Sequence, residues 1–109
     1  MSAVDAAALA QRIESGLDLF ATLHARPGRA GEVRRALEAV RTSIRQEPGC
    51  LAFDCFASIR DPDEFCMHSR WRDLAAFEAH AGLPHTVAFL AQMRDLLDPA
   101  LKITLAQRM

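Results

Sequence analysis

The stretch IRQEPGCLAFDCF, residues 44–56, contains the change of hydrophobic period that decides the fold. Before it, apolar residues recur every three or four positions, which predicts a helix over about residues 32–46. Glu47 precedes a proline, which disfavours a helical backbone, and Gly49 can adopt the positive φ that reverses the chain. After the turn, apolar residues alternate over residues 50–59, which predicts a strand. The two elements therefore meet at Glu47-Pro48-Gly49.

The cysteines of this stretch, Cys50 and Cys55, are predicted to be packing residues. With Cys66 they make an odd number, and no pair has the Cys-x-x-Cys spacing of redox or zinc motifs. Cys50 follows a helix C-terminus, whose dipole disfavours the thiolate form. We therefore expect three reduced thiols that are buried as small hydrophobic side chains, without a nucleophilic role.

Working outward, the rest of the chain divides into short periodic segments. A strand is predicted over residues 17–24, and "FCMHSRW" (65–71) forms a hairpin with the strand before it through the turn "RDPDE". Asp73 is a candidate N-cap for a helix over 74–81. Gly82 and Pro84 separate this helix from a second amphipathic segment, which starts at His85 and ends near Asp98. A last strand is predicted within residues 101–107, and an alanine-rich helix over about 3–15.

The order of these elements predicts an α+β fold, a ferredoxin-like βαββαβ sandwich over residues 17–109 with an N-terminal helical extension over residues 1–16. Two of the strands carry large apolar side chains on both faces, such as Leu19 beside Phe20 and Phe53 near Phe56. Helices can cover only one face of such a sheet. We therefore expect a second copy of the chain to cover the other face, in a homodimer.

Composition narrows the classes of function. The chain has 109 residues, half of them hydrophobic, and a net charge of −1, which gives no global attraction to nucleic acid or to an anionic membrane. No stretch is long and apolar enough to be a membrane span, and the opening residues lack the pattern of a secretory signal, so we expect a cytoplasmic protein. Glycine-rich phosphate loops, serine elbows and paired carboxylate motifs are absent from the sequence.

The break between the two last helical segments is the strongest candidate site. His80 and His85 flank Gly82-Leu83-Pro84, and a helix interrupted over a sheet leaves a cavity beneath the break. Imidazoles placed there can accept protons near neutral pH. A structural alternative is that His85 caps the second segment while His80 lies half-exposed at the end of the first. No acidic third ligand stands at a recognisable spacing from the two histidines, so no metal is predicted.

Four pieces of the sequence together resemble the antibiotic biosynthesis monooxygenase (ABM) domain family, which includes small quinol monooxygenases. They are "RPGRAGEVRRAL", "EPGCLAFDCF", "DPDEF" and "WRDLAAFEAHAGLPHTVAF", in an order that covers residues 17–105. The resemblance implies a dimeric α/β barrel with a pocket between sheet and helices in each subunit. It also implies oxidation of a small phenolic, quinol or polyketide-like substrate by molecular oxygen, without flavin, haem or metal cofactor.

The resemblance also suggests roles for individual residues. His80 and His85 match the family's histidines and are the candidate catalytic residues, for handling protons. Trp71 matches the tryptophan that closes the third strand and is expected to bind the substrate by stacking, with Ser69, Phe77 and Phe89 as further substrate-binding candidates.

One position departs from the family. Many members have Glu-x-Trp where this chain reads Ser69-Arg70-Trp71, and a serine hydroxyl cannot act as a carboxylate base. His68 and His24 lie on neighbouring strands, and alternation places His68 on the face opposite Trp71, so neither receives a role. Three readings stay open: the monooxygenase; a haem-degrading oxygenase or an isomerase on the same scaffold; and a non-catalytic small-molecule binding or stress-response protein.

Overall fold

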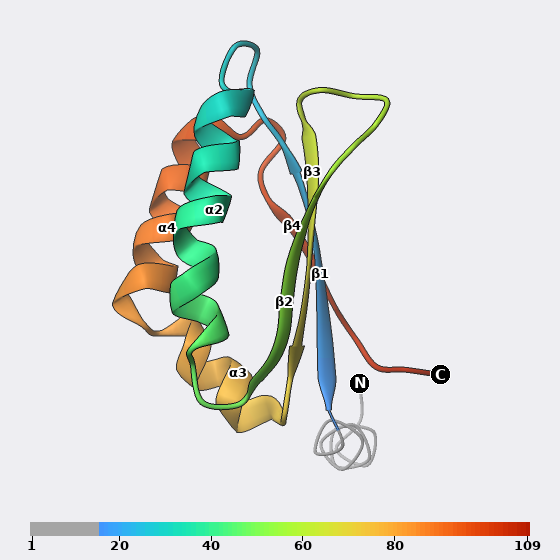
Figure 1. The fold of residues 1–109 in the computed structure, drawn as a ribbon, viewed down its shortest axis with the longest axis vertical. Coiled ribbons are helices and arrows are strands. Elements are labelled where there is room, and N and C mark those ends of the chain that lie inside the picture. The colour runs from blue at the N-terminus through green and yellow to red at the C-terminus, as the bar shows by residue number, and fades with distance from the viewer. Residues whose placement is uncertain (1–15) are drawn as a thin grey trace, which may run out of the picture.

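The structure is a computed structural model that describes residues 16–109, so the helix predicted over residues 3–15 lies outside the described residues. A layer of helices packs against one face of a sheet (Figure 1). The elements are β1 (Leu17–His24), α2 (Ala30–Arg45), β2 (Cys50–Ala57), β3 (Glu64–Trp71), α3 (Leu74–Ala81), α4 (Pro84–Leu96) and β4 (Lys102–Ala106).

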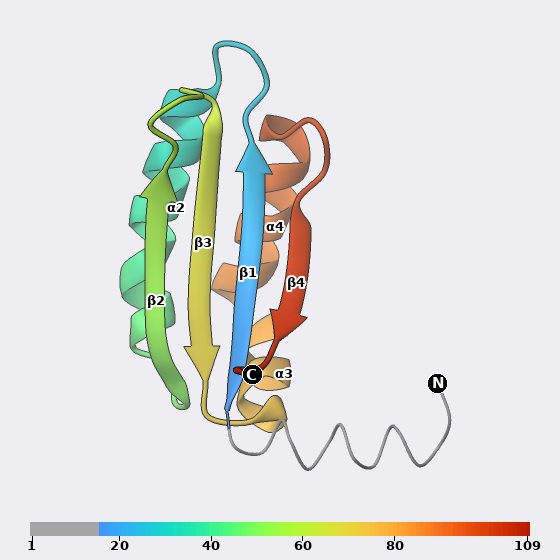
Figure 2. The same cartoon turned by 90° about the vertical axis from the view of Figure 1, so that its right-hand side faces the viewer.

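The four strands form an antiparallel sheet in the order β2-β3-β1-β4. This order, with the two helical connections on one face, confirms the predicted ferredoxin-like α+β fold and its βαββαβ sequence. The second helical connection is divided into α3 and α4, as the Gly-Leu-Pro break predicted. Figure 2 shows the sheet from its other face, with α2 behind β2 and β3 and α4 behind β1 and β4.

The core lies between the helices and the sheet. Its most deeply buried large side chains are Trp71, Leu23, Met93, Leu96 and Val33. On the opposite, outer face of the sheet, Phe20 and Phe56 are 50% and 56% exposed in the single chain. The homodimer expected from this pattern stays a prediction.

Two expectations about β2 and the cysteines need correction. A register shift between Cys50 and Ala52 interrupts the alternation at the start of β2 and leaves Leu51 exposed. Cys66 is exposed on the outer face, so it is not a buried packing residue in the single chain. Cys50 and Cys55 are half-buried, and burial raises the pKa of both thiols, which agrees with an unreactive role.

The turn after α2 is held against the start of α3. Gly49 has a φ of 86°, and a Cβ built on it would come within 2.5 Å of the Cβ of Ala76 in α3. The carbonyl of Gly49 also accepts a hydrogen bond from the backbone N–H of Arg72 at 2.8 Å. Asp73 caps α3 as predicted, because its side chain accepts a hydrogen bond from the N–H of Ala76 at 2.8 Å. That hydrogen bond is the main reason why the pKa of Asp73 is lowered.

Candidate active site

The tight contact of this turn with α3 brings three polar side chains together at the helix break. Nδ1 of His80 lies 2.9 Å and 3.0 Å from the two carboxylate oxygens of Glu47. Nε2 of His85, in the first turn of α4, lies 2.6 Å from Oε2 of the same carboxylate. Both imidazoles therefore donate to one acidic group, and both catalytic candidates belong to a single hydrogen-bonded cluster.

Glu47 is the member of this cluster that sequence reasoning missed. Its side chain is only 5% exposed, although it lies in a turn. The sequence identified it as a helix terminator and placed the family's carboxylate at position 69, where this chain has serine. A carboxylate does stand beside His80, but it comes from the turn after α2. The sequence did contain one signal for Glu47. It stands directly before the Pro-Gly that ends a helix, and such a turn fixes the position of the acidic residue beside it.

His80 is oriented by its neighbours on three sides. Glu47 holds Nδ1, the hydroxyl of Thr86 lies 3.4 Å from the same nitrogen, and the ring lies against the indole of Trp71 with 4.4 Å between centroids. Nε2 has no hydrogen-bond partner in residues 16–109, where no fully buried polar side-chain atom is left unpaired. Nε2 must therefore keep some access to solvent, and it is the nitrogen available to a ligand.

Trp71 and Ser69, which are both on β3, hold the ring of His80 in place. Both are buried, and Nε1 of Trp71 donates a hydrogen bond to Oγ of Ser69 at 3.0 Å. This contact fixes the indole plane against which the His80 ring lies. The structure thus gives Ser69 a positioning contact and places Trp71 behind the imidazole.

An apolar cavity of about 120 Å³ opens beside His80 between the helices and the sheet. Four of the candidates from the sequence line it: Ser69, Phe77, His80 and Phe89. Thr86 is the other polar side chain in the lining, and the remaining lining residues are Leu19, Ile44, Phe53, Met67, Ala81, Leu90, Leu101 and Ile103. A largely apolar lining with a few convergent polar groups is typical of a small-molecule site.

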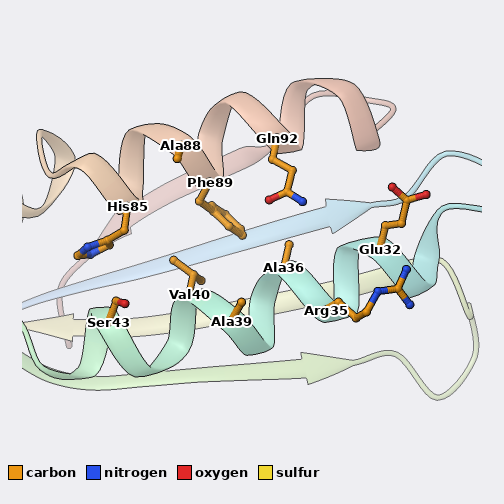
Figure 3. Close-up of a pocket in the computed structure, with 10 residues that line it drawn as sticks. All are labelled: Glu32, Arg35, Ala36, Ala39, Val40, Ser43, His85, Ala88, Phe89 and Gln92. Atoms are coloured by element: carbon orange, nitrogen blue, oxygen red, sulfur yellow. The ribbon is translucent and has the colours of Figure 1, made fainter.

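His85 faces a different space, a wide groove between α2 and α4 (Figure 3). It lies at one end of the groove with Ser43, whereas Glu32 and Arg35 lie at the other end. Phe89 lines both the groove and the inner cavity, so its ring belongs to the wall between them. Glu47 therefore connects a histidine at the cavity with a histidine at the groove.

The alternative reading of the two histidines is wrong. The N-cap of α4 is Leu83, and no side chain caps this helix end, so His85 does not act as a cap. The side chain of His80 is 12% exposed, which is far from half-exposed.

The cluster also has the composition of a metal site. The ligand atoms of Glu47, His80 and His85 lie within 4.8 Å of one another, which supplies the acidic third ligand that the sequence did not identify. The nitrogens and oxygens are paired with one another at hydrogen-bond distances, however, and a bound metal would have to replace the shared protons.

The two remaining histidines lie away from the cavity. His24 pairs with Asp61 at 3.0 Å, and this hydrogen bond is the main reason why the pKa of His24 is raised. His68 lies on the outer face of the sheet, as alternation predicted, at 2.8 Å from the buried carboxylate of Asp18. Neither can contact a ligand beside His80.

The fold and the site define a ferredoxin-like domain with a small apolar pocket and an acid-histidine cluster at its edge. The family profile described as "Antibiotic biosynthesis monooxygenase" matches residues 19–92. The chain belongs to this family, which confirms the resemblance seen in the sequence and supports a monooxygenase-like function. In the described residues, no helix is long and apolar enough to cross a membrane.

Individual relatives agree with this assignment. The chain is 31% identical over 90 residues to the "Putative monooxygenase Rv0793" of Mycobacterium tuberculosis, which covers 83% of this chain and 88% of that protein. The structure of Rv0793 superposes with a TM-score of 0.83 at 28% identity, covering 87% of this chain and 96% of that one. The crystal structure of PA3566 from Pseudomonas aeruginosa gives a TM-score of 0.82 at 35% identity, with coverages of 89% and 97%.

Proposed function

We propose that this protein is a monooxygenase that oxidises a small quinol with molecular oxygen and without a flavin, haem or metal cofactor. The observation that supports this proposal is the hydrogen bond between buried Glu47 and His80 at the edge of an apolar cavity. A carboxylate that accepts from Nδ1 fixes the tautomer in which Nε2 has a free lone pair. His80 is then a general base, and Glu47 is the residue that positions it.

The first step is proton transfer. A quinol O–H bond breaks, the proton goes to Nε2 of His80, and the negative charge of Glu47 stabilises the imidazolium that forms. The quinolate is electron-rich and lies among largely apolar side chains, so it can pass an electron to oxygen. The protein supplies the base, the orientation and the exclusion of water.

The overall reaction balances without an outside reductant. One aromatic C–H bond is replaced by a C–O bond, and the quinol becomes a hydroxyquinone. The substrate loses four electrons, which reduce one O₂: one oxygen atom enters the product, and the other leaves as water with two hydrogens from the substrate. His85 completes the cycle, because Glu47 links it to His80 and its side chain, 31% exposed, can exchange protons with the groove.

The working unit in this proposal is a homodimer in the cytoplasm. Phe20 and Phe56 on the outer face of the sheet support it, because a second copy packed on that face would remove both side chains from water. Analytical ultracentrifugation should then give twice the 12.0 kDa mass of one chain. A 12.0 kDa species at micromolar concentration would contradict the dimer.

The proposed reaction is tested by turnover of one-ring quinols under ¹⁸O₂ with protein dialysed against EDTA. We expect one labelled oxygen atom in each hydroxyquinone and one O₂ consumed for each quinol. Turnover that disappears with EDTA and returns with a metal would contradict the cofactor-free reaction. Ligand-dependent thermal stabilisation without oxygen consumption would identify a binding protein instead.

A further inference from the structure

The inner cavity shares a boundary with a larger depression on the surface. A hollow of about 440 Å³ lies over the end of α4 and the segment before β4, and three of its lining side chains, Leu90, Leu101 and Ile103, also line the inner cavity. These side chains therefore form the partition between the two spaces. Ile103 is 47% exposed, so the partition is open to solvent beside β4. A ligand in the cavity can extend past it into the depression.

The volume of the inner cavity limits what can occupy it. A cavity of about 150 Å³ lined by aliphatic and aromatic side chains accommodates benzene. The inner cavity, at about 120 Å³, is smaller than that, so it has room for at most one six-membered ring and none for a second fused ring. A polycyclic substrate of the polyketide type does not fit it, whereas substituents on a single ring can leave through the partition.

The depression carries charge suited to an anion. Arg26 and Arg94 line it together with one carboxylate, Asp98. Arg26 is only loosely paired with Asp98, at 3.8 Å, and Arg94 forms no ion pair within residues 16–109. Arg94 is in the last turn of α4, four residues after Leu90, so its side chain starts about 6 Å further along the helix axis than that of Leu90.

The two ends of this path are chemically different. His80 is at the end of α3, next to the first turn of α4, and the arginines are near the opposite end of α4 (Figure 1). A ring hydroxyl at His80 therefore directs a substituent on the far side of the ring toward Arg94. The substituent crosses the apolar partition and ends beside a guanidinium group.

We infer that the ligand of this site is a one-ring phenol or quinol that carries a short acidic side chain, with the hydroxyl at His80 and the carboxylate at Arg94. This inference rests on the proposed function for the position of the hydroxyl, but it is tested by binding alone. It adds a specificity-determining residue, Arg94, that lies outside the catalytic cluster.

The test compares three probes by anaerobic isothermal titration calorimetry at low salt: 4-hydroxyphenylacetate, its neutral isostere 4-hydroxyphenylacetamide, and the two-ring 6-hydroxy-2-naphthoate. We expect the acetate to bind about fivefold more tightly than the amide, which corresponds to about 1 kcal/mol for a partly exposed ion pair. Arg94→Gln should remove this advantage and leave the amide unchanged. Arg41→Gln, an exposed arginine on α2, is the control and should keep the advantage.

A second pair of variants tests the path. Ile103→Trp should block the partition and abolish binding of the acetate, whereas Leu105→Trp should not, because Leu105 is equally exposed on the same strand but lines neither space.

Equal affinity for acetate and amide, unchanged preference in Arg94→Gln, or tight binding of the naphthoate would overturn the inference. Binding without the preference for an anion, accompanied by quinol turnover, would leave the proposed function standing. Absence of binding by all three probes would overturn the inference, and absence of quinol turnover would overturn the proposed function.

Discussion

Replacing Glu47 by glutamine tests how the cluster works. Glutamine keeps the shape but is neutral and replaces one of the two acceptor oxygens by an NH₂ group, so the contacts to the imidazoles lose their charge and one acceptor atom. One charge-assisted hydrogen bond is lost, which costs about 1.5–3 kcal/mol and lowers Tm by about 6–12 °C in a domain of this size. The imidazolium of His80 also loses its negative partner. We therefore expect kcat/KM for a quinol to fall by at least about 100-fold.

The assay combines oxygen consumption with thermal unfolding. Glu38→Gln is the matched control, because Glu38 is exposed on α2, and it should change neither quantity by a measurable amount. Oxygen consumption by Glu47→Gln is measured well below the Tm of the variant, so that unfolding does not lower the rate. A variant with a lowered Tm but a kcat/KM within about threefold of wild type would refute the reasoning, since Glu47 would then be only structural.

Three further predictions concern the surroundings of the site and the surface. Ser69→Ala leaves a buried indole N–H unpaired, so thermal unfolding should show a loss of about 1–3 kcal/mol, and wild-type stability would contradict that contact. Gly49→Ala should lower Tm far more than Gly28→Ala. Both glycines have a positive φ, but only Gly49 lacks room for a Cβ, so equal effects would refute the packing argument. The hydrogen bond to Asp61 raises the pKa of His24, and the pKa of Asp61 is lowered first by the backbone N–H of Asp63 and then by His24. The pair therefore stabilises the fold between about pH 4 and pH 6.5, and the contribution of His24 is lost as pH rises through its folded pKa. His24→Gln should therefore lower Tm at pH 5.5 and leave it unchanged at pH 9, and a constant difference would contradict the assignment.

The fold could be predicted because its information is local. The change of period at Glu47-Pro48-Gly49, the cap at Asp73 and the Gly-Leu-Pro break each act on neighbouring residues, and the structure reproduces them. The bulge at the start of β2 could not be predicted, because it depends on pairing with β3. The exposure of Cys66 likewise depends on what covers the outer face of the sheet.

The site could be predicted only in part for the same reason. Its histidines are five residues apart and flank a visible break, but the carboxylate that joins them is 33 residues before His80. A hydrophobic period or a motif within one element gives no information about a contact between residues so far apart in the sequence. It arises because the turn after α2 packs on α3, and this packing follows from the close approach of Gly49 to Ala76.

The central claim is that His80, held by Glu47, takes a proton from a quinol in the cavity and so starts its oxidation. Oxygen consumption by the wild type and by His80→Ala, measured with the same one-ring quinol at the same concentrations, tests it most directly. The account predicts oxygen consumption by the wild type and a rate near the uncatalysed background for a folded His80→Ala variant. Equal rates for the two proteins would contradict it.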